Sequence, residues 1–220
     1  MQNDFNMISL GDDVQNEQIV DNFSTSPKVA TIARIGVLGA LSAVLYAIPG
    51  IPVFPPIYKI DFSTLPALLG GMAMGNTASL LILLIKDLTG LLHSSSMGVG
   101  EIADFLMSGA MCVALCSVYG KKRDRNGALL GIGLGVIATV LMSLFANAAL
   151  LIPFYINVMH LPEDAIVGMM AKLVPQVTSI RTMLAWVVAP FNALKGVILG
   201  VLTLLLYRPL HALLETNRHV

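Results

Sequence analysis

Charged and amide side chains recur inside segments of this chain that are otherwise apolar. Lys86 and Asp87 are adjacent within one apolar run, and Asn192 and Lys195 lie three residues apart within another. Asp61 stands where a proline-rich stretch gives way to a short apolar segment. An unpaired charge in a hydrocarbon environment costs roughly 2.5–3.5 kcal/mol even on a lenient scale, so we expect these groups to pair with one another or with a ligand.

The candidate binding groups come from separate segments of the chain: Asp61, Ser63, Lys86, Asp87, Glu101, Asp104, Asn147, Asn192 and Lys195. The amide groups supply both donors and acceptors, which suits a neutral polyhydroxyl or heterocyclic ligand better than an ion. Glu101 and Asp104 share one face of their helix, and a carboxylate in a first turn also suits the helix dipole. A competing hypothesis is that buried Lys–Asp pairs only fix the register of the helices.

Enzymatic chemistry is disfavoured by the motifs that the sequence lacks. It has no His pair at metal-ligand spacing, no nucleophile motif and no phosphate-binding Gly-Lys loop. Cys112 and Cys116 lie in an apolar run, where they are predicted to be packing residues rather than a disulfide or a metal site. We therefore expect a protein that is not an enzyme and holds no metal or cofactor, and that needs a partner or a gradient to move a solute.

The composition is that of an integral membrane protein. Of its 220 residues, 56% are hydrophobic and 12% charged, and the mean hydropathy is +0.80. The apolar runs have helical lengths, which favours spanning helices over the short alternating segments of a barrel. The predicted fold is an all-α membrane protein with six transmembrane helices, at about 29–48, 61–74, 77–92, 101–119, 127–152 and 181–207. The net charge of zero gives no reason to expect a nucleic-acid partner.

The second of these segments is short for a spanning helix. Its start is therefore expected below the membrane surface, which would take Asp61 and Ser63 into the protein. The proline-rich stretch 49–59 is predicted to be a stiff loop. The fifth span is predicted to end at Pro153, and the long loop 154–179 to carry an amphipathic helix at about 162–173.

The distribution of cations predicts that both termini are cytoplasmic. In that orientation the inner segments hold Lys28, Arg34, Lys121, Lys122, Arg123, Arg125, Arg208 and Arg218, and the outer ones hold Lys59, Lys172 and Arg181. The expected organisation is a disordered acidic tail at 1–27, a six-helix domain at 28–208 and a short cytoplasmic tail at 209–220. The polar candidates then gather in the outer half of the membrane.

The first helix carries small residues at four-residue spacing. Gly36 and Ala40 form one such row, and Gly39, Ala43 and Ala47 form another. Small residues at this spacing let another helix approach closely. These two rows indicate either an internal helix contact or a docking face for another membrane subunit.

At this point the sequence resembles a known family, the substrate-binding S components of energy-coupling factor (ECF) vitamin transporters, and within it the riboflavin type. The resemblance covers about 30–208 and is carried by Asp61-Phe62-Ser63-Thr64-Leu65-Pro66 followed by Ala67-Leu68-Leu69-Gly70-Gly71, Leu84-Ile85-Lys86-Asp87-Leu88, Gly98-Val99-Gly100-Glu101-Ile102-Ala103-Asp104-Phe105, Asn147 with Pro153-Phe154-Tyr155, and Pro190-Phe191-Asn192-Ala193-Leu194-Lys195-Gly196. Thr64 stands where the family commonly has Asp, and Asp87 and Asp104 stand where Asn is common.

The resemblance implies a multi-pass protein of a prokaryotic cell membrane that binds riboflavin from outside. Such a component associates with a transmembrane T component and two cytoplasmic ATPases, which drive delivery inward. The resemblance implies Asp61, Lys86, Asn147, Asn192 and Lys195 as substrate-binding residues, and Ala43 and Ala47 as the contact with the T component. The departures leave open another flavin or heterocyclic vitamin, such as flavin mononucleotide (FMN) or thiamine. The rival classes are a solitary secondary transporter or channel for a small solute, and a membrane enzyme or scaffold.

Overall fold

The structure is a computed structural model that describes residues 27–54 and 58–215. Its elements, in chain order, are α2 (Pro27–Ala47), β1 (Ile51–Phe54), β2 (Tyr58–Ile60), α3 (Leu65–Met74), α4 (Asn76–Gly90), η1 (Leu91–His93), α5 (Val99–Lys121), α6 (Arg125–Ala146), η2 (Asn147–Leu151), α7 (Ile152–Asn157), α8 (Glu163–Ala171), α9 (Ile180–Met183), η3 (Leu184–Val188) and α10 (Ala189–Glu215). All but the last residue of the predicted acidic tail, 1–27, lies outside the described residues, as does 216–220.

Helical segments lie at all the positions where spanning helices were predicted. Four of them are long and apolar enough to cross a membrane: Lys28–Ala47, Val99–Lys121, Arg125–Asn157 and Ile180–Tyr207. The helical membrane protein is therefore confirmed, whereas the count of six spans stays a prediction. The remaining two segments, α3 and α4, have 10 and 15 residues and meet at Gly75, whose φ of 98° favours glycine.

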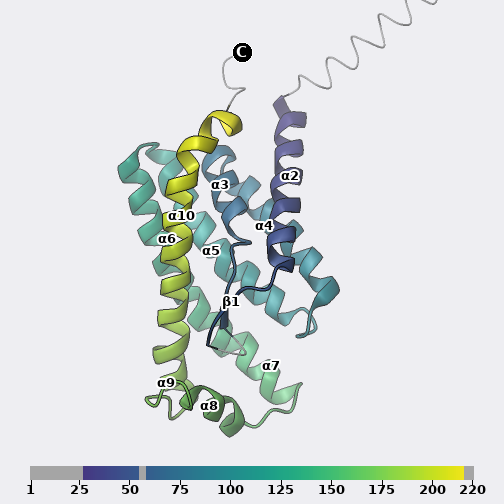
Figure 1. Ribbon diagram of the computed structural model, residues 1–220, viewed down its shortest axis with the longest axis vertical. Coiled ribbons are helices and arrows are strands. Elements are labelled where there is room, and N and C mark those ends of the chain that lie inside the picture. Colours follow the sequence, from purple (N-terminus) through teal and green to yellow (C-terminus); the bar gives the residue numbers. More distant parts are fainter. Residues whose placement is uncertain (1–26, 55–57, 216–220) are drawn as a thin grey trace, which may run out of the picture.

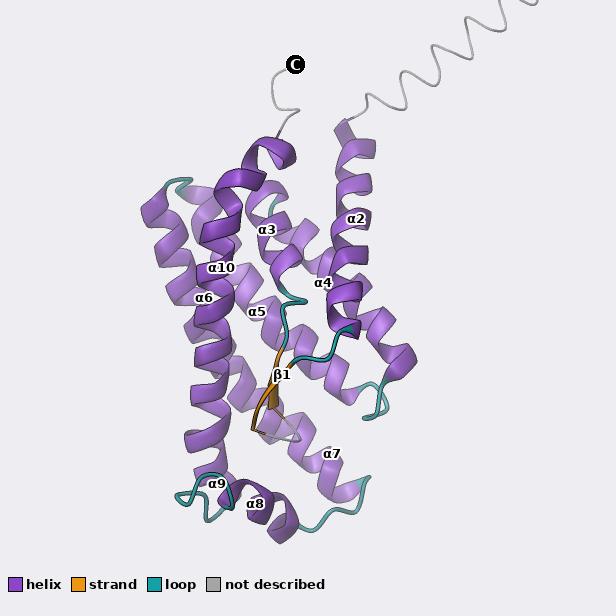
Figure 2. Cartoon of the chain, viewed as in Figure 1, coloured by secondary structure: helices purple, strands orange, loops and turns teal. Residues whose placement is uncertain are grey.

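The helices form an elongated bundle whose two ends differ (Figure 1). α2 begins and α10 ends at the same end of the bundle, and α8 and α9 lie at the opposite end. The β1–β2 hairpin lies between α2 and α10, on the side toward α8 (Figure 2). The hairpin and α8 therefore lie in the same half of the bundle. The topology predicted from the cations places this half, which contains the long loop 154–179, on the outer side, where the candidate residues were expected.

The core of the bundle is built around α3. Nearly every residue of this helix is buried, as expected of a helix that is apolar all round. Its Leu68 and Met72 pack with Ile82 of α4 and with Met111 and Leu115 of α5. A second apolar cluster joins Ile166 and Met170 of α8 to Val177, Met183 and Val187, with Tyr58 and Tyr155 packed against it. The predicted amphipathic helix at 162–173 is confirmed as α8, which covers the end of the bundle.

The proline-rich stretch was predicted to be a loop, but most of it forms a hairpin. β1 and β2 pair antiparallel, with Ile51 opposite Ile60 and Pro52 opposite Lys59. A two-stranded sheet has only edge strands, and an edge strand tolerates a proline because one row of its N–H groups needs no partner. The chain is thereby folded back over the bundle immediately before Asp61.

The prediction that the fifth span ends at Pro153 was wrong. The helix changes to π-helical hydrogen bonding over Asn147–Leu151 and continues as α7 to Asn157, with Pro153 in its first turn. A proline lacks an N–H and collides with the carbonyl four residues earlier, and a wider π turn just before it relieves both problems. π-Helical turns are found frequently at functional sites, and this one begins at a candidate binding residue.

Candidate functional site

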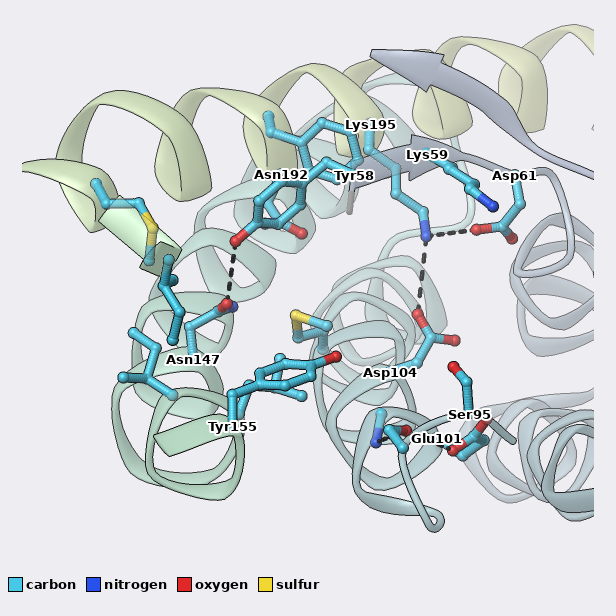
Figure 3. Close-up of a pocket in the computed structure, with 18 of the residues that line it drawn as sticks. Tyr58, Lys59, Asp61, Ser95, Glu101, Asp104, Asn147, Tyr155, Asn192 and Lys195 are labelled. Carbon is cyan, nitrogen blue, oxygen red and sulfur yellow. Dashed lines mark hydrogen bonds and ion pairs between the residues drawn. The ribbon is translucent and has the colours of Figure 1, made fainter. Parts of the chain in front are cut away.

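A cavity of about 510 Å³ lies beneath the hairpin, between α5, the η2–α7 segment and α10 (Figure 3). Its volume is within the range of small-molecule sites. It is lined by Tyr46, Tyr58, Lys59, Asp61, Ser95, Ser96, Gly100, Glu101, Asp104, Met107, Asn147, Leu151, Ile152, Tyr155, Ile166, Met183, Phe191, Asn192 and Lys195. The structure thus brings Asp61, Asn147, Asn192 and Lys195 together around one space.

An ion pair crosses one wall of the cavity. Lys195 of α10 donates from Nζ to Oδ2 of Asp61 at 2.9 Å and lies 3.7 Å from Oδ1 of Asp104. The other carboxylate oxygen of Asp61 accepts from the backbone N–H of Ser63 at 3.1 Å and from its hydroxyl. The ion pair with Lys195 and the two hydrogen bonds from Ser63 hold the Asp61 carboxylate in place, and Asp61 in turn orients Lys195.

The two asparagine amides are oriented by their own helices. Nδ2 of Asn147 donates to the carbonyl of Ser143 at 2.8 Å, and Nδ2 of Asn192 donates to that of Val188 at 2.9 Å. Oδ1 of Asn147 accepts from the Tyr58 hydroxyl at 3.2 Å. Within the described residues no group donates to Oδ1 of Asn192. Both amides therefore present an acceptor oxygen on the cavity side of their helices.

Glu101 and Asp104 reach the cavity from the first turns of α5. Glu101 is only 6% exposed, and its Oε2 accepts from the hydroxyls of Ser94 at 2.7 Å and Ser96 at 3.4 Å. Positive φ angles at Met97 (52°) and Gly98 (89°) turn the chain so that the serines fold back onto α5. A buried carboxylate needs such donors, because an isolated one would be strongly destabilised.

Lys86, which was predicted to bind the ligand, does not line the cavity. It is fully buried behind Asp104, where its Nζ bonds Oδ2 of Asp104 and lies 2.6 Å from Oδ1 of Asp87. The same Nζ lies 4.9 Å from the centre of the Tyr46 ring. Asp87 and Ser63, also in the candidate set, lie outside the lining as well. Lys86, Asp87 and Asp104 together support the cavity wall, and the bond between Lys86 and Asp104 joins α4 to α5.

Aromatic and methionine side chains complete the cavity, and the candidate set contained none of them. Tyr58 packs on Phe191 with ring centroids 5.1 Å apart and planes inclined by 52°. Tyr46, Tyr155, Met107 and Met183 also line the space. Phe191 precedes Asn192 and Tyr155 follows Pro153 by two residues in the motifs, but apolar and aromatic residues in apolar segments carry no separate signal. Tyr58 could have been suspected only from its place beside Lys59.

A second cavity of about 500 Å³ lies beside the first. It is lined by Ala43, Tyr46, Ala47, Ile48, Pro49, Gly50, Lys59, Asp61, Thr89 and Gly90. Tyr46, Lys59 and Asp61 line both spaces. The C-terminal end of α2 carries the predicted docking residues Ala43 and Ala47, which line this second cavity. Between them, Tyr46 of the same helix lines both cavities.

The described residues contain no cluster of His, Cys, Asp and Glu that could hold a metal ion. Cys112 and Cys116 are free and buried. The cavity is partly open and is lined by amides, carboxylates, the ammonium groups of Lys59 and Lys195, hydroxyls and aromatic rings, in a helical membrane bundle. This arrangement is that of a helical membrane protein with a cavity suited to a polar, ring-containing small molecule.

Comparison with known proteins identifies the family. The chain belongs to the substrate-specific components of ECF transporters, whose sequence pattern matches residues 30–207. It is 29% identical over 180 residues to the riboflavin transporter RibU of Staphylococcus aureus, an alignment that covers 81% of this chain and 89% of the relative. It is 26% identical over 199 residues to the riboflavin transporter FmnP of Bacillus subtilis, covering 87% of this chain and 97% of that protein.

A solved structure shares the fold. The S component of a bacterial ECF transporter superposes on 86% of this chain and 99% of its own length, with a TM-score of 0.66 and 26% sequence identity. The predicted resemblance to S components is thereby confirmed.

Proposed function

We propose that this chain is the riboflavin-binding S component of an ECF transporter. It captures the vitamin on the outer face of the membrane and delivers it inward when coupled to a T component and two ATPases. The observation that carries the proposal is the cavity beneath the hairpin, which combines two oriented amides with aromatic walls in a chain related to riboflavin transporters.

Riboflavin has a polarity that suits the groups that line this cavity. It has a flat three-ring system with polar atoms along one edge, and a hydroxylated chain, and it carries no charge. The rings of Tyr58 and Phe191 with the neighbouring apolar side chains supply contacts for a flat aromatic ligand. Oδ1 of Asn192 can accept from the ring N–H, and Lys195 can donate to a ring carbonyl. A site that combines apolar walls with a few oriented polar groups is typical for such ligands.

The predicted substrate-binding residues then take different roles. Asn147, Asn192 and Lys195 contact the ligand, whereas Asp61 acts mainly by holding Lys195. Asn147 also anchors the hairpin by accepting a hydrogen bond from the Tyr58 hydroxyl. Lys86 keeps Asp104 in place from behind the wall and does not touch the ligand.

The proposed topology has six spans with both termini in the cytoplasm, in the cell membrane of a prokaryote. Two observations support it: the cations predicted to lie inside outnumber those outside, and α2 begins at the end of the bundle where α10 ends (Figure 1). α3 and α4 are then short spans: α3 is buried among its neighbours, whereas α4 exposes Leu81, Leu84 and Leu88 on one side. The cavity and the hairpin face outward in this orientation.

The proposed contact with the T component is made by α2 through Ala43 and Ala47. α2 exposes one side to its surroundings, including Val37, Leu41 and Val44, and small residues at four-residue spacing permit close helix packing beside them. The chain has no nucleotide-binding motif of its own, so ATP hydrolysis is assigned to the partner subunits.

Titration of the detergent-solubilised chain with riboflavin, followed by quenching of flavin fluorescence, tests the proposal. We expect saturable binding at nanomolar concentration and an upward shift of the melting temperature, because a ligand that binds only the folded state stabilises it. FMN, thiamine, biotin and folate are measured in parallel. Stabilisation by thiamine, biotin or folate and not by riboflavin would overturn the assignment. Uptake by vesicles that hold this chain alone would instead indicate a solitary transporter.

A further inference from the structure

The two ends of the cavity differ in chemistry (Figure 3). Asn147 and Tyr155 lie at one end, with Tyr58 and Asn192 nearby, and we call this the aromatic end. Glu101 and Ser95 lie at the other, and we call this the carboxylate end. A ligand that fills the cavity therefore meets aromatic rings and amides on one side and hydroxyl and carboxylate oxygens on the other.

Glu101 differs from the other acidic residues of the cavity. Asp61 is paired with Lys195, and Asp104 lies against both Lys86 and Lys195. In the part of the chain that the structure describes, no cation forms an ion pair with Glu101. Its carboxylate is held only by serine hydroxyls, and these occupy Oε2. Since a carboxylate can accept about four hydrogen bonds, Glu101, itself buried, retains acceptor capacity at the wall of the cavity.

Hydroxyl groups are the donors that best fit such an acceptor. A neutral polyol offers several O–H donors in a row, and a bond from O–H to a carboxylate is short and stronger than one between neutral groups. The Ser95 hydroxyl lies beside Glu101 and can donate to or accept from the same polyol. The rings and amides at the aromatic end suit a flat heterocycle instead. The carboxylate end thus offers oxygen acceptors for a polyol, beside the ring of Tyr46, and the aromatic end offers amides and rings for a heterocycle.

We infer that Glu101 is the residue that binds the hydroxylated chain of the ligand, with Ser95 beside it. The ligand then lies with its ring system at the aromatic end and its polyol at the carboxylate end. This inference rests on the proposed binding of riboflavin and adds the orientation of the vitamin and the residue that distinguishes riboflavin from a flavin without its ribityl chain. Ser94 and Ser96 act as positioning residues that fix the carboxylate.

The alternative is that Glu101 only stabilises the start of α5, where a carboxylate suits the helix dipole. The two roles predict different responses to the ligand. A residue that binds the polyol affects only ligands that have a polyol, whereas a residue that stabilises the helix affects every ligand that occupies the folded site.

The test compares riboflavin with lumiflavin, which has the same ring system and a methyl group in place of the ribityl chain. We expect the wild-type chain to bind riboflavin at least tenfold more tightly than lumiflavin. Glu101→Gln and Glu101→Ala should each weaken riboflavin binding about tenfold or more, the size expected for a hydrogen bond to a charged group. Both should leave lumiflavin binding within about twofold, since this ligand does not reach the carboxylate.

Two further variants separate the inference from its alternatives. Asn192→Ala removes an amide at the aromatic end and should weaken riboflavin and lumiflavin by similar factors. Glu163→Gln neutralises an exposed acid of α8 outside the cavity and should change neither. If Glu101→Gln fails to fold, Ser95→Ala provides the second test and should weaken riboflavin alone.

Equal weakening of the two ligands by the Glu101 variants would overturn the inference in favour of a structural role. Unchanged riboflavin binding in those variants would also overturn it. Failure of the wild-type chain to bind riboflavin at all would overturn the proposed function itself, and this outcome is visible before any variant is made.

Discussion

The Nζ atom of Lys195 lies 2.9 Å from Oδ2 of Asp61 and joins two parts of the chain that are far apart in sequence. Asp61 follows the hairpin directly, and Lys195 is in the middle of α10. Their side chains are only 20% and 13% exposed, so water screens the attraction weakly. The pair therefore fixes the hairpin, which covers the cavity, to a helix that lines it.

Removing the cation alone should destabilise the protein. Lys195→Met leaves the Asp61 carboxylate partly buried without its partner, which costs about 3 kcal/mol in comparable pairs. Lys195→Met combined with Asp61→Asn should recover much of that loss, because the uncompensated charge is gone. Thermal unfolding in detergent without ligand measures both effects. Simple additivity of the two single substitutions would show that the pair is not coupled.

Substitution of Lys86 should separate stability from binding. Lys86→Met leaves Asp87 and Asp104 unpaired in the interior and should lower the free energy of unfolding by about 3–5 kcal/mol. The variant that remains folded should bind riboflavin within about threefold of the wild type, a change of less than about 1 kcal/mol, because Lys86 does not line the cavity. Both quantities are measured on the same detergent preparation.

The matched control for this prediction is Lys122→Met. Lys122 lies 3.7 Å from Asp124 on the exposed surface, where an ion pair is worth about 0–1 kcal/mol, so its loss should hardly change the melting temperature. A large loss of riboflavin affinity in Lys86→Met, at an unchanged melting temperature, would instead support direct contact between Lys86 and the ligand.

The sequence predicted the helical membrane fold, because long apolar runs and a lack of charge determine the class directly. It also predicted that polar residues inside those runs would meet, since each needs a partner in hydrocarbon. Asp61 and Lys195 satisfy that expectation in the structure. That these two residues meet therefore followed from the cost of leaving each of them unpaired.

The sequence could not show which polar residues line the cavity and which lie behind its wall. Lys86 and Lys195 are both lysines in apolar runs, yet one lies behind the wall and the other lines the cavity, because helix rotation decides which. The continuation of the fifth helix through Pro153 depends on a π turn, and no simple periodicity predicts that turn. Tyr58 and Phe191 are aromatic residues whose role emerges only when the hairpin meets α10.

Tyr58→Phe should weaken riboflavin binding by about two- to tenfold. The substitution keeps the ring packed on Phe191 but removes the hydroxyl that donates to Oδ1 of Asn147 at 3.2 Å, a bond worth about 0.5–1.5 kcal/mol. Tyr58→Ala also removes the ring contact and should weaken binding further. Tyr119→Phe is the control, because its hydroxyl bonds Tyr207 in the other core cluster. An affinity loss of equal size in both Phe variants would contradict the role of Tyr58.

Enlarging the small residues of α2 should block transport without affecting capture of the vitamin. Ala43→Leu and Ala47→Leu place bulky groups where a partner helix is proposed to pack, and close packing tolerates no such group. We expect riboflavin affinity of the isolated chain within about twofold of the wild type, since neither residue lines the first cavity. Co-purification with the T component and ATP-dependent uptake should fall at least fivefold, a loss of about 1 kcal/mol of binding energy. Ala138→Leu on α6 serves as the matched control and should leave both intact. Loss of uptake with retained co-purification would place the effect of these substitutions on delivery rather than docking.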